Sequence, residues 1–118
     1  MNVFDITNEK IKTINVDKEE FKITAILPKE KIEIAVKRSY LQNGLSLESF
    51  GYKDVEFFDK IATVDVCVIS KPNFYSKFDS CQEWPDEYVI SELYDQIKRR
   101  TKILEEKLKK NRSTPGST

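Results

Sequence analysis

Alternating apolar and polar residues near the start of the chain predict a β-hairpin. Two short apolar runs, 11–16 and 21–27, flank the polar segment 17–20. The second run has the period of two that is typical of a strand with one buried face. Phe21, Ile23, Ala25 and Leu27 alternate with Lys22 and Thr24, although Ile26 breaks the pattern. Because a lone hairpin is marginally stable in water, we expect it to pack on the rest of the chain.

The segment after Pro28 has the spacing of an amphipathic helix. Apolar or small residues recur at intervals of three and four, as on one helix face. These residues are Ile32, Ala35, Val36, Ser39 and Tyr40. The opposite side is expected to carry Glu30, Lys31, Glu33, Lys37, Arg38 and Gln42. Asn43-Gly44 supplies a C-terminal stop. A strand is the alternative, because apolar residues also alternate over 32–36, but we favour the helix.

Residues 53–70 predict a second helix, which follows a connecting loop at 45–54. Its apolar residues cover much of the helix circumference, which is typical of a central helix. They are Val55, Phe57, Phe58, Ile61, Ala62, Val64, Val66 and Ile69. The β-branched run at 64–69 lowers helix propensity, so we expect the last turns to be irregular and the helix to end before Pro72.

A third helix is predicted to begin at Pro85-Asp86-Glu87, where proline and acidic residues suit a first turn. Its apolar residues lie near heptad spacing, interrupted at Thr101. They are Val89, Ile90, Leu93, Ile97, Leu104 and Leu108. We expect the first half to pack in the core. The second half extends beyond any evident packing partner within the chain, so we expect it to contact another protein.

These elements predict an α+β fold, mainly α, with a short N-terminal β-hairpin packed on three principal helices. Residues 1–112 form a single globular domain in this prediction, and residues 113–118 form a flexible polar tail. No apolar run approaches the roughly 20 residues that a membrane-spanning helix needs. The first ten residues lack the pattern of a secretory signal. We therefore expect a cytoplasmic protein that does not enter membranes.

The composition argues against an enzyme. The 118 residues include no histidine, two cysteines and three glycines. Catalytic Cys-His or Ser-His-Asp sets, a four-ligand zinc site and a glycine-rich phosphate loop are therefore not expected. The acids Asp54, Glu56, Asp59 and Asp65 are expected to form a solvated helix face. The sequence thus predicts no catalytic, metal-binding or cofactor-binding residue. We expect Cys67 to be a core residue and Cys81 to be an exposed thiol.

The charge is balanced overall but unevenly distributed. Residues 46–96 hold eleven acidic and four basic residues, whereas residues 97–118 hold eight basic and two acidic residues. This separation of acidic and basic segments favours self-association or partners of mixed charge. The basic run Lys98, Arg99 and Arg100 has the charge to bind phosphates, but it has no aromatic platform and lies beside acidic residues. We therefore expect a charged helix end and no nucleic-acid partner.

Aromatic residues gather between the second and third helices. Phe74, Tyr75, Phe78 and Trp84 lie within eleven residues of one another. Tyr and Trp are enriched at protein interfaces, although the same residues also serve as core. Both interpretations stay open for this segment. The predicted protein-binding residues are Phe74, Tyr75, Phe78, Trp84, Ile97, Leu104 and Leu108.

The order of these segments resembles the tail assembly chaperones of long-tailed, siphovirus-like bacteriophages. The resemblance covers residues 12–100 and is carried by FKITAILPKEKIEIAVKRSYLQNGLSLESF, KIATVDVCVISKPNFY and WPDEYVISELYDQIKRR. It implies a non-enzymatic protein of the host cytoplasm, absent from the finished virion. Such a chaperone binds the tape measure protein and helps recruit tail tube subunits during virion morphogenesis.

Two further function classes remain open. The first is a structural virion component, such as a head-tail connector or a tail-completion protein. That protein would use a permanent, larger and more apolar interface within a ring. The other is a small nucleic-acid-associated regulator that would use the basic end of the last helix.

Overall fold

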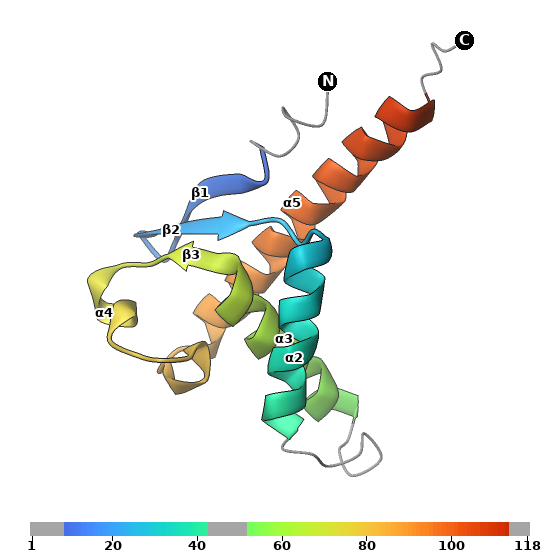
Figure 1. Ribbon diagram of the computed structural model, residues 1–118. Coiled ribbons are helices and arrows are strands. Elements are labelled where there is room, and N and C mark those ends of the chain that lie inside the picture. The colour runs from blue at the N-terminus through green and yellow to red at the C-terminus, as the bar shows by residue number, and fades with distance from the viewer. Residues whose placement is uncertain (1–8, 43–51, 114–118) are drawn as a thin grey trace.

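A computed structural model describes residues 9–42 and 52–113 of the chain (Figure 1). The predicted Asn43-Gly44 stop and most of the loop at 45–54 lie outside these residues, as does most of the tail. The elements are β1 (Ile11–Val16), β2 (Glu19–Thr24), α2 (Pro28–Gln42), α3 (Tyr52–Cys67), β3 (Val68–Ser70), the single turn α4 (Asn73–Ser76), the 3-10 turn η2 (Cys81–Glu83) and α5 (Glu87–Ser113). The predicted α+β fold, mainly α, is confirmed, as are the N-terminal hairpin and the three principal helices.

The hairpin has a tighter turn than predicted. Asp17 and Lys18 have φ angles of 52° and 68°, so these two residues alone form the turn. Positive φ at both central positions is typical of the two-residue turns that match the twist of a hairpin. As a result, the second strand begins at Glu19 and ends at Thr24, whereas the prediction placed it at 21–27.

Residues 25–27 leave the sheet and are held by α5. The backbone N–H of Ile26 donates a 2.9 Å hydrogen bond to Thr101 Oγ1, and that hydroxyl donates to the Ile97 carbonyl at 2.8 Å. A buried backbone N–H needs an acceptor. Thr101 supplies it, which explains the polar residue that interrupts the heptad spacing of α5.

The start of α2 is capped by Glu30. Its Oε1 accepts a 3.0 Å hydrogen bond from the Leu27 N–H, and its Oε2 lies 3.2 Å from Lys10 Nζ. A glutamate that reaches back to the first free N–H of a helix forms half of a capping box. Glu30 is therefore buried, although the sequence placed it on the solvent side of the helix.

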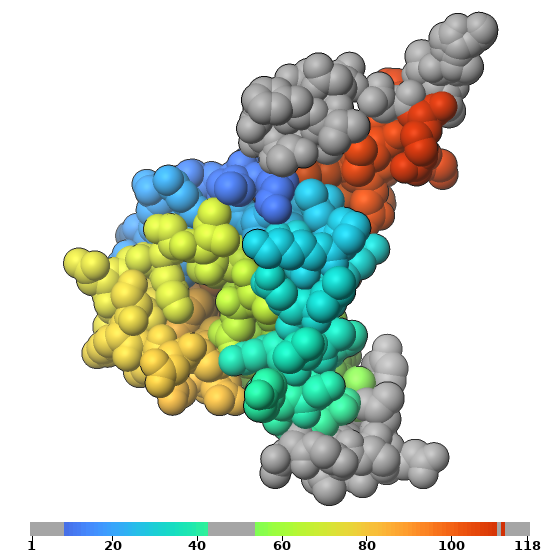
Figure 2. All heavy atoms as spheres, in the orientation of Figure 1, coloured from blue at the N-terminus to red at the C-terminus, as the bar shows by residue number. Residues whose placement is uncertain are grey.

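Helix α2 does not pack on the chain through the apolar stripe that the sequence shows. The helix packs on α3 through Ile34, which is buried, and Leu41, which is partly buried against the core. Ile32, Val36 and Tyr40 face solvent. Figure 2 shows α2 on the face in view, with no other described element lying across it. The helix therefore has two apolar stripes. The narrower one, Ile34 and Leu41, is the one that packs on the core.

The predicted second helix ends earlier than Ser70. Helix α3 stops at Cys67, and Val68–Ser70 forms β3, which pairs antiparallel with β2. The sheet order is therefore β1-β2-β3. The β-branched residues at the end of the run suit a strand better than a helix. The predicted irregularity is thus a change to extended structure, which lets α3 lead directly into the sheet.

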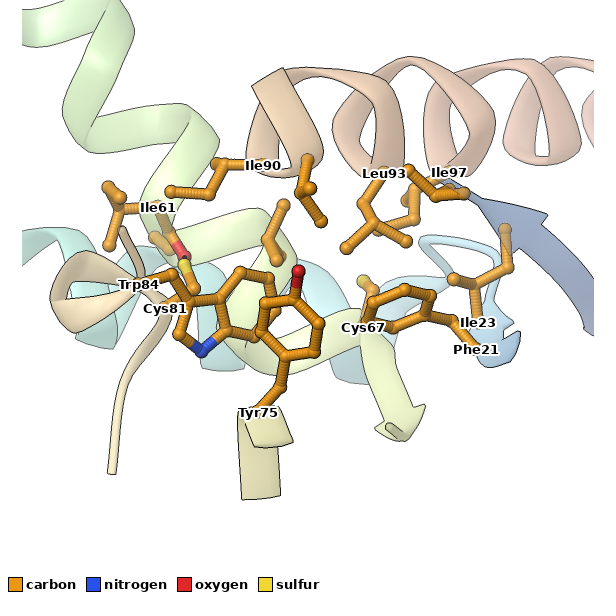
Figure 3. Packing of buried hydrophobic residues seen from close by; sticks show 14 of the residues in the cluster. Phe21, Ile23, Ile61, Cys67, Tyr75, Cys81, Trp84, Ile90, Leu93 and Ile97 are labelled. Atoms are coloured by element: carbon orange, nitrogen blue, oxygen red, sulfur yellow. Dashed lines mark hydrogen bonds between the residues drawn. The ribbon is translucent and has the colours of Figure 1, made fainter. Parts of the chain in front are cut away.

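The main core lies between the sheet, α3 and α5 (Figure 3). Helix α5 runs past the sheet and α2, and its C-terminal turns extend beyond them (Figure 1). Its first half contributes Val89, Ile90, Leu93 and Ile97, all buried. Helix α3 contacts α2, α5, β3 and η2, which confirms its predicted central position. No helix within the described residues is long and apolar enough to span a bilayer.

Candidate protein-binding surface

The outer face of α2 carries a row of exposed apolar side chains. Ile32, Val36 and Tyr40 are 68%, 53% and 78% exposed. They are spaced four residues apart, so each lies about one turn beyond the previous one on the same face. We call these residues the α2 stripe. Scattered exposed apolar residues are ordinary, but three in a row on one helix face form a continuous strip that a partner can cover.

Ion pairs to α3 hold the α2 stripe outward. Lys37 Nζ lies 3.5 Å from Asp65 Oδ2, and Arg38 Nη1 lies 3.2 Å from Asp59 Oδ1. Both cations therefore point toward α3, on the same general side as Ile34. A rotation of α2 that buried its stripe would break both pairs. The orientation of the helix thus depends on apolar packing and charge together.

The predicted aromatic cluster is divided between core and surface. Tyr75 and Trp84 are buried, with ring centroids 4.7 Å apart, and both rings pack near Phe21 (Figure 3). Phe74 is 49% exposed, and Phe78 is half-buried. Within the described residues, Trp84 Nε1 is a buried side-chain donor without a hydrogen-bond partner. Of these four aromatic residues, Tyr75 and Trp84 are therefore core residues, and Phe74 and Phe78 lie at the surface.

Lys77 covers the exposed part of that cluster. Its Nζ lies 4.6 Å from the ring centroid of Phe74 and 5.5 Å from that of Phe78. Phe74 also meets Phe78 edge to face, with centroids 5.8 Å apart. These contacts shield part of both rings from water.

The remaining predicted binding residues lie on α5, facing inward. Ile97 and Leu104 are fully buried, and Leu108 is partly buried. Leu104 packs with Ala25, which leaves the sheet toward α5. The expectation that this half of the helix has no packing partner within the chain is therefore wrong for Leu104. The sequence could not show that residues 25–27 cross over it.

The basic run of α5 is partly engaged within the chain. The Arg100 guanidinium donates hydrogen bonds to the Glu9 carbonyl, and Lys107 Nζ lies 2.8 Å from the Glu9 carboxylate. The hydrogen bond from Lys107 lowers the pKa of Glu9. Lys98 Nζ lies 5.7 Å from the ring centroid of Tyr94. The contacts of Arg100 and Lys107 with Glu9 attach α5 to the segment before β1.

Asp65 is a structural acceptor and not part of a solvated face. Its Oδ2 accepts a 2.6 Å hydrogen bond from Ser80 Oγ, and its Oδ1 accepts a 2.7 Å bond from the Cys81 N–H. This carboxylate therefore holds η2 against α3. As a result, Cys81 is buried, and the prediction of an exposed thiol is wrong. Burial raises the pKa of both thiols, that of Cys67 to about 12.

Asp59 joins three helices. Besides Arg38 of α2, it accepts a hydrogen bond from the hydroxyl of Tyr94 on α5. Burial, followed by this hydrogen bond, raises the pKa of Tyr94 to about 12. Asp59 and Asp65, both predicted in the solvated face, are thus structural acceptors, and Asp54 and Glu56 are exposed. In the described part of the chain, no group of three or more Cys, Asp or Glu side chains is placed to hold a metal ion.

Comparisons of the chain with protein-family models, with curated proteins and with solved structures found no match. The candidate site therefore rests on the geometry of this chain. The sequence contained the signal for the α2 stripe, because the spacing of Ile32, Val36 and Tyr40 is evident. The spacing did not show that this stripe faces solvent in the folded chain.

Proposed function

We propose that this protein is a non-enzymatic phage tail assembly chaperone that covers the tape measure protein through the α2 stripe. In this proposal it also helps to recruit tail tube subunits and acts in the host cytoplasm. The resemblance over residues 12–100 supports the choice of family. The observation that supports a binding role is the exposure of Ile32, Val36 and Tyr40 on one helix face.

The α2 stripe suits a helical client. An amphipathic helix presents apolar side chains at the same spacing of three and four, so two such stripes can pack along each other. Full burial of an Ile or Val side chain contributes about 1.5–3 kcal/mol. Association itself costs several kcal/mol or more, so three side chains support weak, reversible binding by one copy. Many copies along one long client would then give strong overall coverage.

Charged residues border the α2 stripe. Lys29 and Glu33 lie on the same helix as an i,i+4 pair with 4.0 Å between Nζ and Oε1, and both are well exposed. Such pairs add little stability but keep the surrounding surface soluble. A client with charges of both signs beside its apolar residues would find complementary groups here. This arrangement suits a protein that must release its client when assembly ends.

Coexpression with the tape measure protein of the same phage tests the proposal. We expect the wild-type chain to keep that protein soluble and to copurify with it. The double variant Ile32→Asp, Val36→Asp should lose most of this effect, because it places two charges in the stripe. Circular dichroism and urea unfolding should show that the variant still folds, since both positions face solvent.

The matched control is Tyr88→Asp, Ile103→Asp, which places the same charges at exposed apolar positions of α5. It should rescue the client as the wild type does. If the α2 variant rescues equally well, the stripe is not the binding surface. If the wild type gives no rescue, the chaperone proposal fails. Mass spectrometry of purified particles should also miss the protein, whereas a stoichiometric signal would identify a structural virion component.

A further inference from the structure

Two pockets of opposite charge lie along α3 and α5. The acidic pocket, of about 360 Å³, is lined by Glu56, Phe57, Lys60, Glu87 and Ser91. The basic pocket, of about 290 Å³, is bounded by three cations, Lys31 and Arg38 of α2 and Lys98 of α5. Thr63 and Asp59 of α3 also line the basic pocket. Neither pocket includes a residue of the α2 stripe.

Helix geometry places the two pockets in order along one side of the molecule. Glu87, Ser91, Tyr94 and Lys98 are spaced by four, three and four residues, so they share one face of α5. Glu56, Lys60 and Thr63 share a face of α3 in the same way. At 1.5 Å per residue, the eleven residues from Glu87 to Lys98 span about 16 Å. The charged ends of the two pockets on α5, Glu87 and Lys98, are therefore about three helical turns apart, whereas on α3 the pocket residues Lys60 and Thr63 are only about one turn apart.

Tyr94 lies between Ser91 of the acidic pocket and Lys98 of the basic pocket on this face of α5. Lys60 Nζ lies 5.9 Å from its ring centroid and Lys98 Nζ lies 5.7 Å from it. The Tyr94 hydroxyl donates to Asp59, so the ring is held in place. Lys60 lines the acidic pocket and Lys98 lines the basic pocket, so both pockets have a wall that contacts this ring. We call this strip, from Glu87 to Lys98, the α3–α5 groove.

The groove has a positive and a negative end. In the basic pocket, three cations face one carboxylate, and Asp59 is already bonded to Arg38 and Tyr94. Lys31 and Lys98 therefore leave an excess of positive charge. At the other end, Glu56 and Glu87 are both exposed and face one lysine, Lys60. Phe57, 37% exposed, adds an apolar contact beside these two carboxylates.

We infer that the α3–α5 groove binds a helical segment of a partner protein that carries carboxylates at one end and basic side chains two to three turns away. The carboxylates would lie at Lys31, Arg38 and Lys98, and the basic side chains at Glu56 and Glu87. Because the two ends differ in sign, the groove also fixes which way the segment lies. This second surface goes beyond the proposed function and does not depend on the identity of its client.

Two synthetic helical peptides of equal composition test the inference. In one, acidic residues are separated from basic residues by eleven positions; in the other, the same residues alternate along the same face. Fluorescence anisotropy with the full chain should show at least tenfold tighter binding of the charge-separated peptide. Raising the salt concentration to about 0.5 M should remove most of that preference, because it screens exposed charges.

Charge reversal in the groove supplies the controls. The double variant Lys31→Glu, Lys98→Glu should bind the charge-separated peptide at least tenfold more weakly than the wild type does. The control variant Lys12→Glu, Lys22→Glu, on the sheet, should bind it with unchanged affinity. Adding Glu56→Lys, Glu87→Lys to the first pair should restore binding, because the peptide can then lie in the opposite direction. Circular dichroism should show that each variant is folded.

Equal binding of the two peptides, no binding of the charge-separated peptide, or no effect of reversing Lys31 and Lys98 would overturn the inference. Sedimentation of the chain alone tests for another occupant, a second copy of the chain. A dimer that dissociates when those lysines are reversed would show that the second copy fills the groove and would overturn the inference. The outcome of the coexpression experiment is independent of these results, because it tests the α2 stripe.

Discussion

The hydroxyl of Tyr94 on α5 donates a 2.9 Å hydrogen bond to Oδ2 of Asp59 on α3. The other oxygen of the same carboxylate lies 3.2 Å from the Arg38 guanidinium on α2. One aspartate thus links the three principal helices. This contact also sets the position of the ring that divides the α3–α5 groove.

Tyr94→Phe removes this hydrogen bond without creating a large cavity. We expect the free energy of unfolding to fall by about 1 kcal/mol, the usual net value of one such bond. Urea unfolding at neutral pH measures the change. Tyr88→Phe, at an exposed position of the same helix, should change stability by less than about 0.5 kcal/mol. Equal effects of the two substitutions would mean that the bond to Asp59 contributes nothing.

The raised pKa of Tyr94 predicts a loss of stability at high pH. An unperturbed tyrosine has a pKa of about 10, and in the folded protein that of Tyr94 is about 12. The folded state therefore holds its proton more tightly than the unfolded state does. The stabilising contribution is complete below about pH 10 and is lost as the pH rises toward 12. Urea midpoints measured from pH 8 to 11.5 should fall more steeply for the wild type than for Tyr94→Phe. Parallel curves would contradict the assignment.

Asp65→Ala removes the acceptor that holds η2 against α3. The N–H of Cys81 and the hydroxyl of Ser80 lose a partner, and leaving a buried donor unpaired costs about 1–3 kcal/mol. Urea unfolding should show a loss in this range. The same change at the exposed Asp95 should cost less than about 0.5 kcal/mol. A similar small loss at Asp65 would show that this carboxylate is dispensable.

Leu104→Ala distinguishes a packed α5 from one that depends on another protein. Since Leu104 is fully buried in the isolated chain, its truncation should cost about 2–5 kcal/mol, as is usual for a core leucine. Ile103→Ala, one position earlier but exposed, should have little effect on the thermal midpoint. If both variants unfolded alike, residues 25–27 would not pack on this part of the helix.

Several features of the fold were predictable from local pattern. The alternation at 21–25 and the spacing of apolar residues on each helix identified the elements, because a strand and a helix bring different residues to one face. Strand β3 was missed, since three residues are too few to show a period. Pairing with β2 makes those residues a strand.

The candidate site was less predictable. The spacing of Ile32, Val36 and Tyr40 is visible in the sequence, but it does not tell which side of α2 meets α3. Ile34 and Leu41 define a second, narrower stripe that packs on the core, and the ion pairs of Lys37 and Arg38 with α3 lie on that side of the helix. The α3–α5 groove was not predictable either, because its basic pocket joins residues of α2 and α5 that lie sixty or more positions apart in the chain.

By itself, the sequence determined the order and type of the main elements, the excess of apolar residues on each helix, and the separation of acidic and basic segments. These depend on short-range periodicity and composition. The tertiary structure alone decided which apolar stripe is buried, which carboxylates become acceptors and where Leu104 packs. Those outcomes depend on contacts between distant segments, where burial of one face and the pairing of a few charges outweigh local preference.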